Sequence, residues 1–361
     1  MSADDQASRL ISADSHLEVP ITMWCPRKLL DDLRRSMASD TFATRVARSY
    51  LGAVEWRPDG ELPDWEVEGD GPSFSAEDRV SDMDLDGVAA EVLYPALAFD
   101  LFAASTFEPS LTVDVASTYN DWLSNYCTPY QDRLWGMAVV PHAGAELAVA
   151  EASRAARLPG IRGISFQQWP AGNPRIGPED DLFWSWASKS GVPITFHIGV
   201  GGGLGAERGS QVTSPAYLLA PFAGHTEYVV AQFIVAGVFD RFPQLRIAVG
   251  ETGVGWISFF CEQMDLNYQR LRWSGAVPNL DKLPSDYVRE HFLFVMQEDR
   301  FGLRTAGAEL LRHAMWGSDY PHTVTNWPAS QRLMGEQLTS VPPDIAERIR
   351  WRNAVEFYGS R

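Results

Sequence analysis

Most of the chain after residue 75 alternates between two patterns of apolar and polar positions. In residues 77–87, Val80, Met83 and Leu85 recur with a helical period before a glycine, and residues 89–95 form a short apolar run stopped by proline. A helical period indicates an amphipathic helix, and a short apolar run between turn residues indicates a buried strand. These residues therefore predict one helix followed by one strand.

The same alternation repeats toward the C-terminus. Helices are predicted near residues 111–128, 145–157, 181–190, 226–239, 254–272 and 299–312. Strands are predicted at residues 134–140, 163–166, 192–197, 245–249, 292–296 and 314–317. Together with residues 89–95 and the apolar run Leu10–Ala13, this makes eight strands of the kind that a parallel sheet buries on both faces.

The predicted fold is an α/β protein, a (β/α)8 TIM barrel with a small insertion after strand 1 and C-terminal helices. The alternative is an open doubly wound sheet, which normally carries a glycine-rich phosphate turn directly after its first strand. The residues after Ala13 contain no such turn. We therefore expect one barrel domain over residues 8–361.

Two segments depart from the alternation. Residues 21–75 lose the apolar period and include a loop rich in Gly, Pro, Trp and Asp, which we interpret as an insertion that covers one end of the barrel. Residues 199–209 are rich in glycine, but polar residues follow them where a nucleotide-binding turn would open an apolar helix. We predict a mobile lid there.

Charge and cysteine content narrow the range of partners and compartments. The chain carries 47 acidic and 30 basic residues, a net charge of −17, which repels nucleic acid and anionic membrane surfaces. Its three cysteines, Cys25, Cys127 and Cys261, lack the spacing of a disulfide framework or a zinc site and are expected as buried thiols. The N-terminus has no apolar targeting segment. We expect a cytoplasmic protein that binds a small molecule.

Acidic and imidazole side chains gather at the ends of predicted strands. Asp14 and His16 follow the first strand, His197 closes the fifth, Glu251 closes the sixth and Asp319 follows the eighth. A TIM barrel builds its active site at these C-terminal strand ends. Singly, a helix cap or a core histidine explains each residue equally well. Together they predict a nitrogen and oxygen site for Zn²⁺ or Mn²⁺ at the barrel mouth.

These residues and their neighbours resemble the amidohydrolase superfamily (amidohydrolase-related family 2). The resemblance is to the branch that contains aminocarboxymuconate-semialdehyde decarboxylase and the resorcylate-type decarboxylases, and it covers nearly the whole chain. The marks that carry it are Asp14-Ser15-His16 with Glu18 and Pro20, Met83-Asp84 with Gly87-Val88, His197, Gly237-Val238-Phe239 with Phe242-Pro243, and Gly317-Ser318-Asp319-Tyr320-Pro321.

The resemblance implies a set of metal ligands and an assembly. The family's ligands fall on Asp14, His16, His197 and Asp319, which would hold one divalent ion, Zn²⁺ or alternatively Mn²⁺, without an organic cofactor. The first ligand is His or Glu in the well-known members and is aspartate here. The resemblance also implies a homodimer.

The resemblance assigns the acid–base roles less directly. The family histidine beside the metal falls on Glu251, so that this glutamate, Asp319 or the nearby His225 is expected to move protons. A family arginine that clamps the substrate carboxylate falls near residues 262–263, which are Glu and Gln here.

Three further residues are candidates for the surroundings of the metal and the substrate. His322 follows Asp319 on the same loop and could orient a ligand or a bound water. Trp169 and Trp327 follow the fourth and eighth predicted strands, where they could stack on an aromatic substrate. Generic packing explains the two tryptophans equally well.

Two reactions and one non-catalytic role fit the sequence. The branch favours a metal-dependent decarboxylase of an aromatic or unsaturated carboxylic acid. The absent arginine and the acidic surface favour a hydrolase of an amide, lactone or carbon–carbon bond that uses an activated water. A barrel that only binds a ligand is the third possibility, and metal content would distinguish it from both enzymes.

Overall fold

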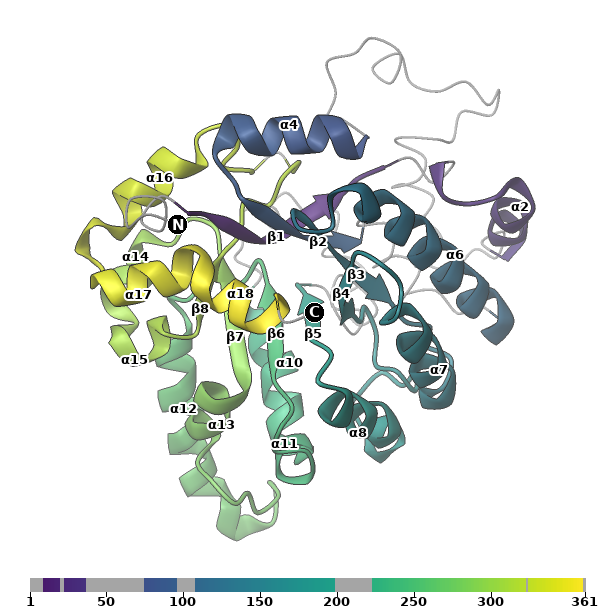
Figure 1. Cartoon of the computed structure of the whole chain (residues 1–361). Helices are drawn as coiled ribbons and strands as arrows, with labels where there is room; N and C mark the ends of the chain where they lie inside the picture. The colour runs from purple at the N-terminus through teal and green to yellow at the C-terminus, as the bar shows by residue number, and fades with distance from the viewer. Residues whose placement is uncertain are drawn as a thin grey trace.

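The computed structural model describes residues 9–19, 23–36, 75–95, 108–198, 223–322 and 324–359. In these ranges, eight parallel strands pair in sequence order to form one sheet that curls into a barrel, with helices around it (Figure 1). The strands are β1 (Ile11–Leu17), β2 (Ala90–Pro95), β3 (Leu134–Val139), β4 (Ile161–Ser165), β5 (Ile194–His197), β6 (Ile247–Gly250), β7 (Phe292–Met296) and β8 (Ala314–Trp316). The predicted TIM barrel is confirmed.

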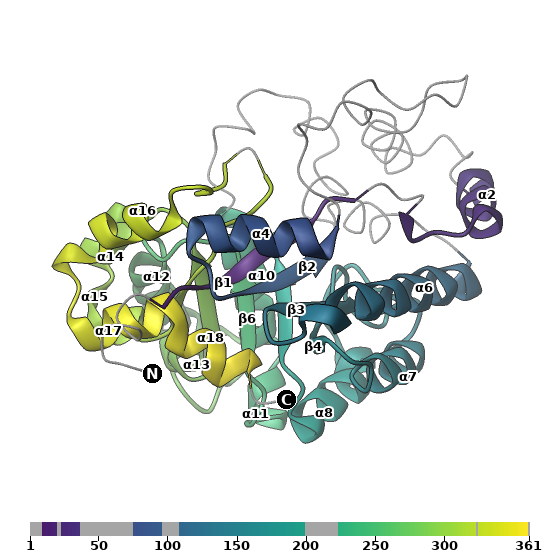
Figure 2. The same ribbon diagram turned by 45° about the horizontal axis from the view of Figure 1, so that its top comes forward.

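The α-helices lie outside the sheet, as Figure 2 shows for α4, α6, α7 and α8. They are α2 (Arg27–Ser36), α4 (Ala76–Asp86), α6 (Pro109–Cys127), α7 (Ala145–Ala155), α8 (Asp181–Ser190), α10 (Ala223–Val235), α11 (Val238–Arg241), α12 (Ile257–Leu271), α13 (Pro284–His291), α14 (Arg300–Thr305), α15 (Gly307–Leu311), α16 (Ser330–Gln337), α17 (Pro343–Glu347) and α18 (Asn353–Tyr358). Short 3-10 and π turns join several of them.

Local signals explain where individual helices begin and end. The Ser75 hydroxyl accepts a hydrogen bond from the Asp78 N–H and so caps the first turn of α4. Gly87 ends α4 with a φ of 71°, a left-handed conformation that glycine adopts without steric cost. In the predicted helix 299–312, Gly307 also has a positive φ, and the segment is divided into α14 and α15.

The interior and the exterior of the barrel form separate apolar layers. Alternate strand residues, such as Val92, Met137 and Val295, fill the interior, and the other alternate residues pack against the helices. The last helix, α18, closes the end opposite the mouth, since Asn353 donates a hydrogen bond to the carbonyl of Ala314 at the start of β8. The interior of the barrel is therefore a packed core.

The barrel closes at a seam between β1 and the chain that follows β8. The Asp319 N–H donates to the Asp14 carbonyl at 2.9 Å, and the His16 N–H donates to the Tyr320 carbonyl at 2.7 Å. Ser15 and Tyr320 form an isolated parallel bridge there. Strand β8 itself is only three residues long, so these bonds extend the pairing beyond its end.

Three buried serines complete the seam through their hydroxyl groups. Ser12 Oγ donates to the Asp14 carbonyl at 2.7 Å and accepts from the Ser318 N–H at 2.8 Å. The hydroxyls of Ser15 and Ser318 share a hydrogen bond at 3.0 Å. Polar side chains therefore replace part of the regular strand pairing where the barrel closes, and they do so directly beside Asp14.

The structure corrects two features of the predicted elements. Strand β1 extends to Leu17, so Asp14 and His16 lie within the strand and not after it, because pairing with β2 continues past the polar residues. Helix α13 was not predicted; it begins at Pro284 after a polar loop and is eight residues long, too short for a clear apolar period.

Some predictions fall on residues outside the described ranges. They include the lid at residues 199–209 and most of the insertion at residues 21–75, of which α2 is described.

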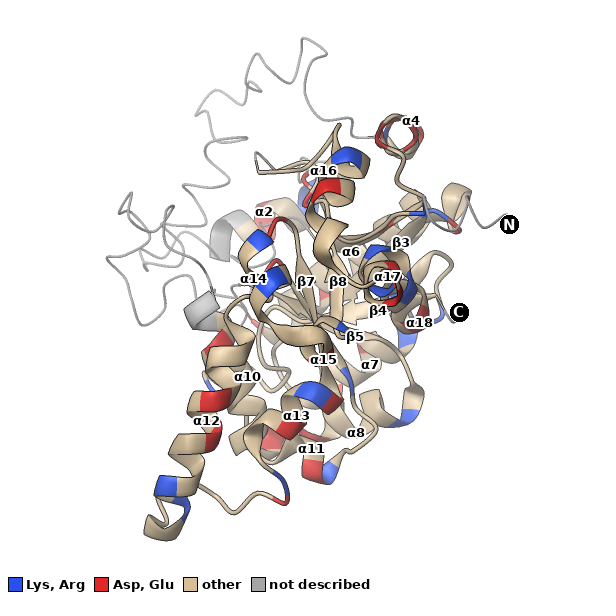
Figure 3. Cartoon of the chain, turned by 90° about the vertical axis from the view of Figure 1, so that its left-hand side faces the viewer, with Lys and Arg blue, Asp and Glu red and all other residues tan. Residues whose placement is uncertain are grey.

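The three cysteines are buried, as predicted. Acidic and basic positions occur together on outer helices such as α12 (Figure 3). In the described part of the chain, no helix has the length and apolar character needed to cross a membrane.

Candidate metal and active site

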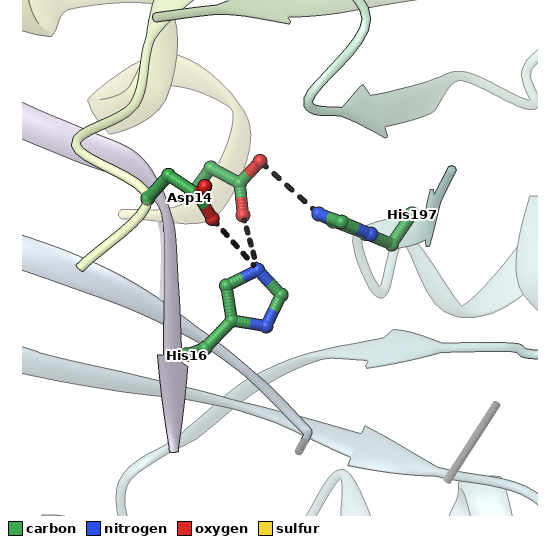
Figure 4. Close-up of side chains that lie close together, drawn as sticks. Asp14, His16 and His197 are labelled. Carbon is green, nitrogen blue, oxygen red and sulfur yellow. Dashed lines mark ion pairs between the residues drawn. The ribbon is translucent and has the colours of Figure 1, made fainter. Parts of the chain in front are cut away.

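Four predicted residues converge at the C-terminal mouth of the barrel. His16 Nε2 lies 3.4 Å from Asp14 Oδ1 and 3.3 Å from Asp319 Oδ1, and His197 Nε2 lies 3.5 Å from Asp14 Oδ2. The Asp14 carboxylate thus faces both imidazole rings (Figure 4). One nitrogen or oxygen atom from each of the four residues lies within 4.8 Å of the others. The barrel therefore joins residues that are more than 300 positions apart.

The burial of these atoms indicates what they hold. Asp14 and Asp319 are each 1% exposed and His16 is 3% exposed. The carboxylate oxygens of both aspartates and Nε2 of both histidines make no well-aligned hydrogen bond in the described structure. They face one another, Glu251 and His322 at ion-pair distances only. Buried polar atoms without hydrogen bonds are unfavourable unless they bind something. Two imidazoles and two carboxylates fit a divalent cation, and the four residues form such a site.

The pKa values of the cluster residues also support a site for a cation. Burial alone would lower the pKa of His16, but Asp14 and Asp319 raise it to about 10. Burial likewise opposes the charge on His197, and Asp14 raises its pKa to about 9. The pKa of Asp14 is lowered: burial raises it, but the two histidines outweigh burial. Without a cation the site is therefore held together by protonated histidines, whose positive charge a metal ion would replace.

Backbone conformation directs two of the acidic side chains. Glu251 has a φ of 54° and Asp319 a φ of 55°. In the described part of the chain, these two are the non-glycine residues with a positive φ. Glu251 directly follows β6, and Asp319 comes shortly after β8. A left-handed conformation is uncommon for residues with a side chain and tends to occur at functional sites. No sequence pattern indicated this strain.

Two glycines allow the strands to approach Asp14. A Cβ atom on Gly317 would lie 2.5 Å from Asp14 Cβ, and one on Gly250 would lie 2.7 Å from His197 Cδ2. Real Cβ atoms do not approach other atoms so closely, so a side chain at either position would move a ligand. The two glycines are therefore part of the site even though they provide no ligand atom.

Glu251 lies beside the four-residue cluster. Its Oε2 is 3.4 Å from His197 Nε2, and its side chain is 23% exposed, in contrast to the two buried aspartates. Burial raises its pKa to about 7, an effect that the neighbouring His197 only partly opposes. A carboxyl group with this pKa exists in both protonation states near neutral pH and can exchange a proton with a molecule in the mouth.

His322 connects Asp319 to a second carboxylate. Its Nδ1 is 2.8 Å from Asp319 Oδ1, its Nε2 is 3.3 Å from Glu18 Oε1, and its ring stacks on His16 with centroids 4.2 Å apart. Burial opposes its protonation, but Asp319 and Glu18 raise its pKa to about 10. His322 thus lies between Asp319 and Glu18, and its role in orienting a ligand or a bound water stays a prediction.

Glu18 was not predicted as a site residue. It lies two positions after His16, just beyond β1, and alternation along an extended chain places residues 14, 16 and 18 on the same side. That spacing was the signal in the sequence that could have identified it.

The remaining candidates are two tryptophans, whose contacts are described, and His225, whose side chain is not. Trp169 is fully buried against Phe166 and Phe233, in the layer between the strands and the helices. Trp327 packs edge-on against Tyr320 and donates its Nε1–H to the carbonyl of Asp82. Both rings thus have structural contacts, and stacking on a substrate stays a prediction. His225 belongs to the first turn of α10, and its side chain is outside the described part.

The fold and the cluster define a TIM-barrel protein with a histidine and aspartate site for a divalent cation at its mouth. The chain belongs to the amidohydrolase family, since the profile of the family described as Amidohydrolase matches residues 13–360. The family predicted from the residues is therefore confirmed.

Curated relatives carry the names of decarboxylases. The chain is 26% identical over 233 residues to gamma-resorcylate decarboxylase of Rhodococcus jostii, covering 61% of this chain and 68% of the relative. It is 23% identical over 291 residues to gamma-resorcylate decarboxylase of Polaromonas sp., covering 78% of this chain and 86% of the relative.

Solved structures share the fold over the full length. The 5-carboxyvanillate decarboxylase of Sphingomonas paucimobilis matches with a TM-score of 0.75 at 18% identity, covering 98% of this chain and 99% of that chain. The 5-carboxyvanillate decarboxylase of Novosphingobium aromaticivorans was solved with manganese and 4-hydroxy-3-methoxy-5-nitrobenzoic acid. It matches with a TM-score of 0.74 at 17% identity, over 99% of this chain and 98% of that chain.

Proposed function

We propose that the protein is a metal-dependent decarboxylase that acts on an aromatic carboxylic acid without an organic cofactor. The observation that carries the proposal is the buried cluster of Asp14, His16, His197 and Asp319, which brings one nitrogen or oxygen atom from each residue within 4.8 Å of the others. Its place in the amidohydrolase family and the names of its curated relatives support the reaction.

The four residues of the cluster would hold one divalent ion. Manganese in a related structure supports Mn²⁺, and the nitrogen and oxygen ligands are equally suited to Zn²⁺. When bound, the ion supplies positive charge that holds and polarises oxygen atoms of the substrate. The two buried aspartates would neutralise the charge of the bound ion.

We assign the acidic role to Glu251 and the ligand role to Asp319. Decarboxylation of a ring carbon needs a proton donor, because a proton replaces the departing carboxyl group. Glu251 is partly exposed at the mouth, and burial raises its pKa, so it retains a proton at higher pH than an ordinary glutamate. Asp319 is buried, and His16 and His322 outweigh burial to lower its pKa, which favours the ionised form that binds a cation.

A hydrolase that uses an activated water is the second candidate. It is favoured by one observation: α12 presents Glu262 and Gln263 at the position where the family resemblance would place an arginine for the substrate carboxylate. In that reaction an ionised carboxylate accepts a proton from water. The substrate would then be an amide, a lactone or an activated carbon–carbon bond.

We also propose that the protein works as a homodimer in the cytoplasm. Large aromatic side chains exposed on the outer helices, such as Phe259 on α12, offer apolar surface for a second copy. The three buried free cysteines are consistent with a reducing compartment.

A substrate panel tests the proposed reaction. Purified protein loaded with Mn²⁺ or Zn²⁺ would be assayed for release of CO₂ from a series of hydroxybenzoic acids, beside a series of esters and lactones. We expect CO₂ release from at least one acid, one metal ion per chain, and loss of both in His197→Ala. Hydrolysis without CO₂ release would favour the second candidate, and a protein that turns over neither series would contradict both.

A further inference from the structure

Arg79 is buried beneath the seam that closes the barrel, and the proposed chemistry gives it no role. It lies on α4, outside the barrel wall, and its side chain is 2% exposed. A buried arginine needs partners for its charge and for its five N–H groups. The partners of Arg79 therefore indicate what it does.

The guanidinium group reaches both sides of the seam. Nη1 donates to the carbonyl of His16 at 2.7 Å, and Nη2 lies 3.5 Å from the carbonyl of Tyr320. The guanidinium carbon also lies 5.0 Å from the centre of the Tyr320 ring. His16 is a member of the metal cluster, and Tyr320 directly follows another member, Asp319. One side chain thus contacts the backbone beside two ligands from opposite ends of the chain.

A buried carboxylate holds the guanidinium group in place. Arg79 Nε donates to Glu91 Oε2 at 2.7 Å, and Glu91 on β2 is itself buried. Because the guanidinium group is planar and rigid, this bond also fixes the directions of the Nη1 and Nη2 N–H groups. Glu91 therefore determines the direction in which Arg79 meets the two carbonyls.

We propose that Arg79 is a positioning residue for the metal centre. By binding the carbonyl of His16 while it contacts Tyr320, it sets the distance between the His16 ring and the Asp319 carboxylate, 3.3 Å in the structure. The inference rests on the proposed metal site and goes beyond it, since Arg79 touches neither the cation nor the substrate. Partners of this kind outside the ligand shell tune metal affinity.

Arg133 provides a control for Arg79, because it also binds α4 but at the opposite end of the barrel from the metal cluster. Arg133 donates to the carbonyls of Val88 and Ala89 and forms an ion pair with Asp84 on α4. It therefore joins α4 and the loop before β2 to the start of β3, at the N-terminal ends of the strands and away from the metal cluster. We expect loss of either arginine to weaken the packing of α4, but of the two only Arg79 contacts the backbone of a cluster residue.

The experiment compares Arg79→Lys with Arg133→Lys. Lysine keeps the charge but cannot bind Glu91 and two carbonyls in a fixed geometry. Mn²⁺ affinity would be measured by competition with a fluorescent chelator, the visible spectrum of bound Co²⁺ would report ligand geometry, and thermal unfolding would report stability. We expect both variants to unfold at lower temperature. Arg79→Lys alone should lose about tenfold or more in Mn²⁺ affinity and change the Co²⁺ spectrum.

Several outcomes would overturn the inference. Mn²⁺ affinity within twofold of wild type in Arg79→Lys, or an equal loss in Arg133→Lys, would make Arg79 a purely structural residue. If Arg79→Lys does not fold, Glu91→Gln replaces it and should also lower Mn²⁺ affinity; an unchanged affinity there would refute the role. Wild-type protein that binds no Mn²⁺ or Zn²⁺ would instead refute the proposed metal site itself, and the same titration shows this.

Discussion

Glu251 and Asp319 share an unusual backbone conformation, but their surroundings give them opposite acidities. Both have positive φ angles at the barrel mouth. Around Glu251, burial outweighs His197 and raises the pKa to about 7. Around Asp319, burial is outweighed by His16 and His322, and the pKa is lowered. The number of imidazole partners therefore supports the proposed roles of Glu251 as proton donor and Asp319 as metal ligand.

This separation predicts different defects for the two amide variants. Glu251→Gln should keep the metal and lose about a hundredfold or more in turnover, because an amide cannot donate the proton. Asp319→Asn should lose metal affinity first, because a neutral amide binds a cation less strongly. Metal titration and steady-state kinetics measure both effects. Asp132→Asn, which changes an exposed acid in the turn before β3, is the control that should change neither.

The pH dependence of turnover tests whether Glu251 acts as the proton donor. A proton donor must be protonated, so turnover should fall as pH rises through the pKa of Glu251. Burial raises that pKa from 4.5 to about 7, and a bound cation lowers it, so the falling limb should lie between these values. Glu251→Gln should lack this limb. A wild-type profile without it would assign the proton to another group.

At the scale of elements, the site depends on how closely the end of β8 approaches β1. The Asp319 N–H binds the Asp14 carbonyl, and Gly317 lies against Asp14 with no room for a Cβ atom. Strand β8 is short, so these contacts and the serine hydroxyls hold the seam. The position of a ligand is thus controlled by a residue that has no side chain.

Gly317→Ala should therefore affect metal binding and stability together. The new methyl group overlaps Asp14 Cβ and Val295 Cγ1, and overpacking of this kind costs about 1–3 kcal/mol of stability. Because Asp14 must move, Mn²⁺ affinity should fall as well. Chelator competition and thermal unfolding measure the two effects.

Gly335→Ala is the matched control for that variant. Gly335 lies in α16, and a Cβ atom there would meet nothing within 4 Å. Alanine in a helix interior stabilises by about 0.5–1 kcal/mol relative to glycine, so this variant should be slightly more stable with unchanged metal affinity. Equal metal affinity in both variants would show that Asp14 can shift without loss of the site.

For the whole molecule, the cluster joins strands on opposite sides of the barrel. Asp14 and His16 come from β1, His197 from β5, and Asp319 from the chain after β8. A cation bound by all four would link the first, middle and last parts of the chain. Binding only to the folded state stabilises that state, by about 2.7 kcal/mol at a hundredfold excess over Kd.

Removal of the metal should accordingly lower the unfolding temperature, and more so at higher pH. In the metal-free protein, His16 and His197 have folded-state pKa values of about 10 and 9, raised from 6.5. Their contribution to stability is complete below pH 6.5 and is lost as pH rises through 9 to 10. Metal binding needs neutral imidazoles, so metal affinity increases over the same range.

The gap in unfolding temperature between metal-loaded and chelated protein should therefore widen from pH 6 toward pH 9. Thermal unfolding with and without a chelator, at several pH values, measures this gap. His197→Ala should show a much smaller gap throughout. A gap that narrows with rising pH would contradict the assignment of the two histidines as ligands.

The sequence by itself determined the barrel and the residue types at its mouth. The apolar period of a segment reflects which of its faces is buried. Because helical and strand periods alternate along the chain, each unit of one helix and one strand can be identified from the local sequence. Position at a strand end then placed Asp14, His16, His197 and Asp319 at one mouth, because all strand ends in a parallel barrel point the same way. Element ends were less clear: β1 continues through polar residues, and α13 is short.

Only the tertiary structure decided how those residues differ from one another. The pKa of Glu251 and of Asp319 depends on burial and on imidazoles contributed by distant strands, which no local pattern records. The proposed roles of Gly317 and Arg79 rest on contacts across the seam between residues far apart in the chain. Local patterns encode which face of an element is buried, whereas the distances that set metal binding and acidity exist only once the first and last strands meet.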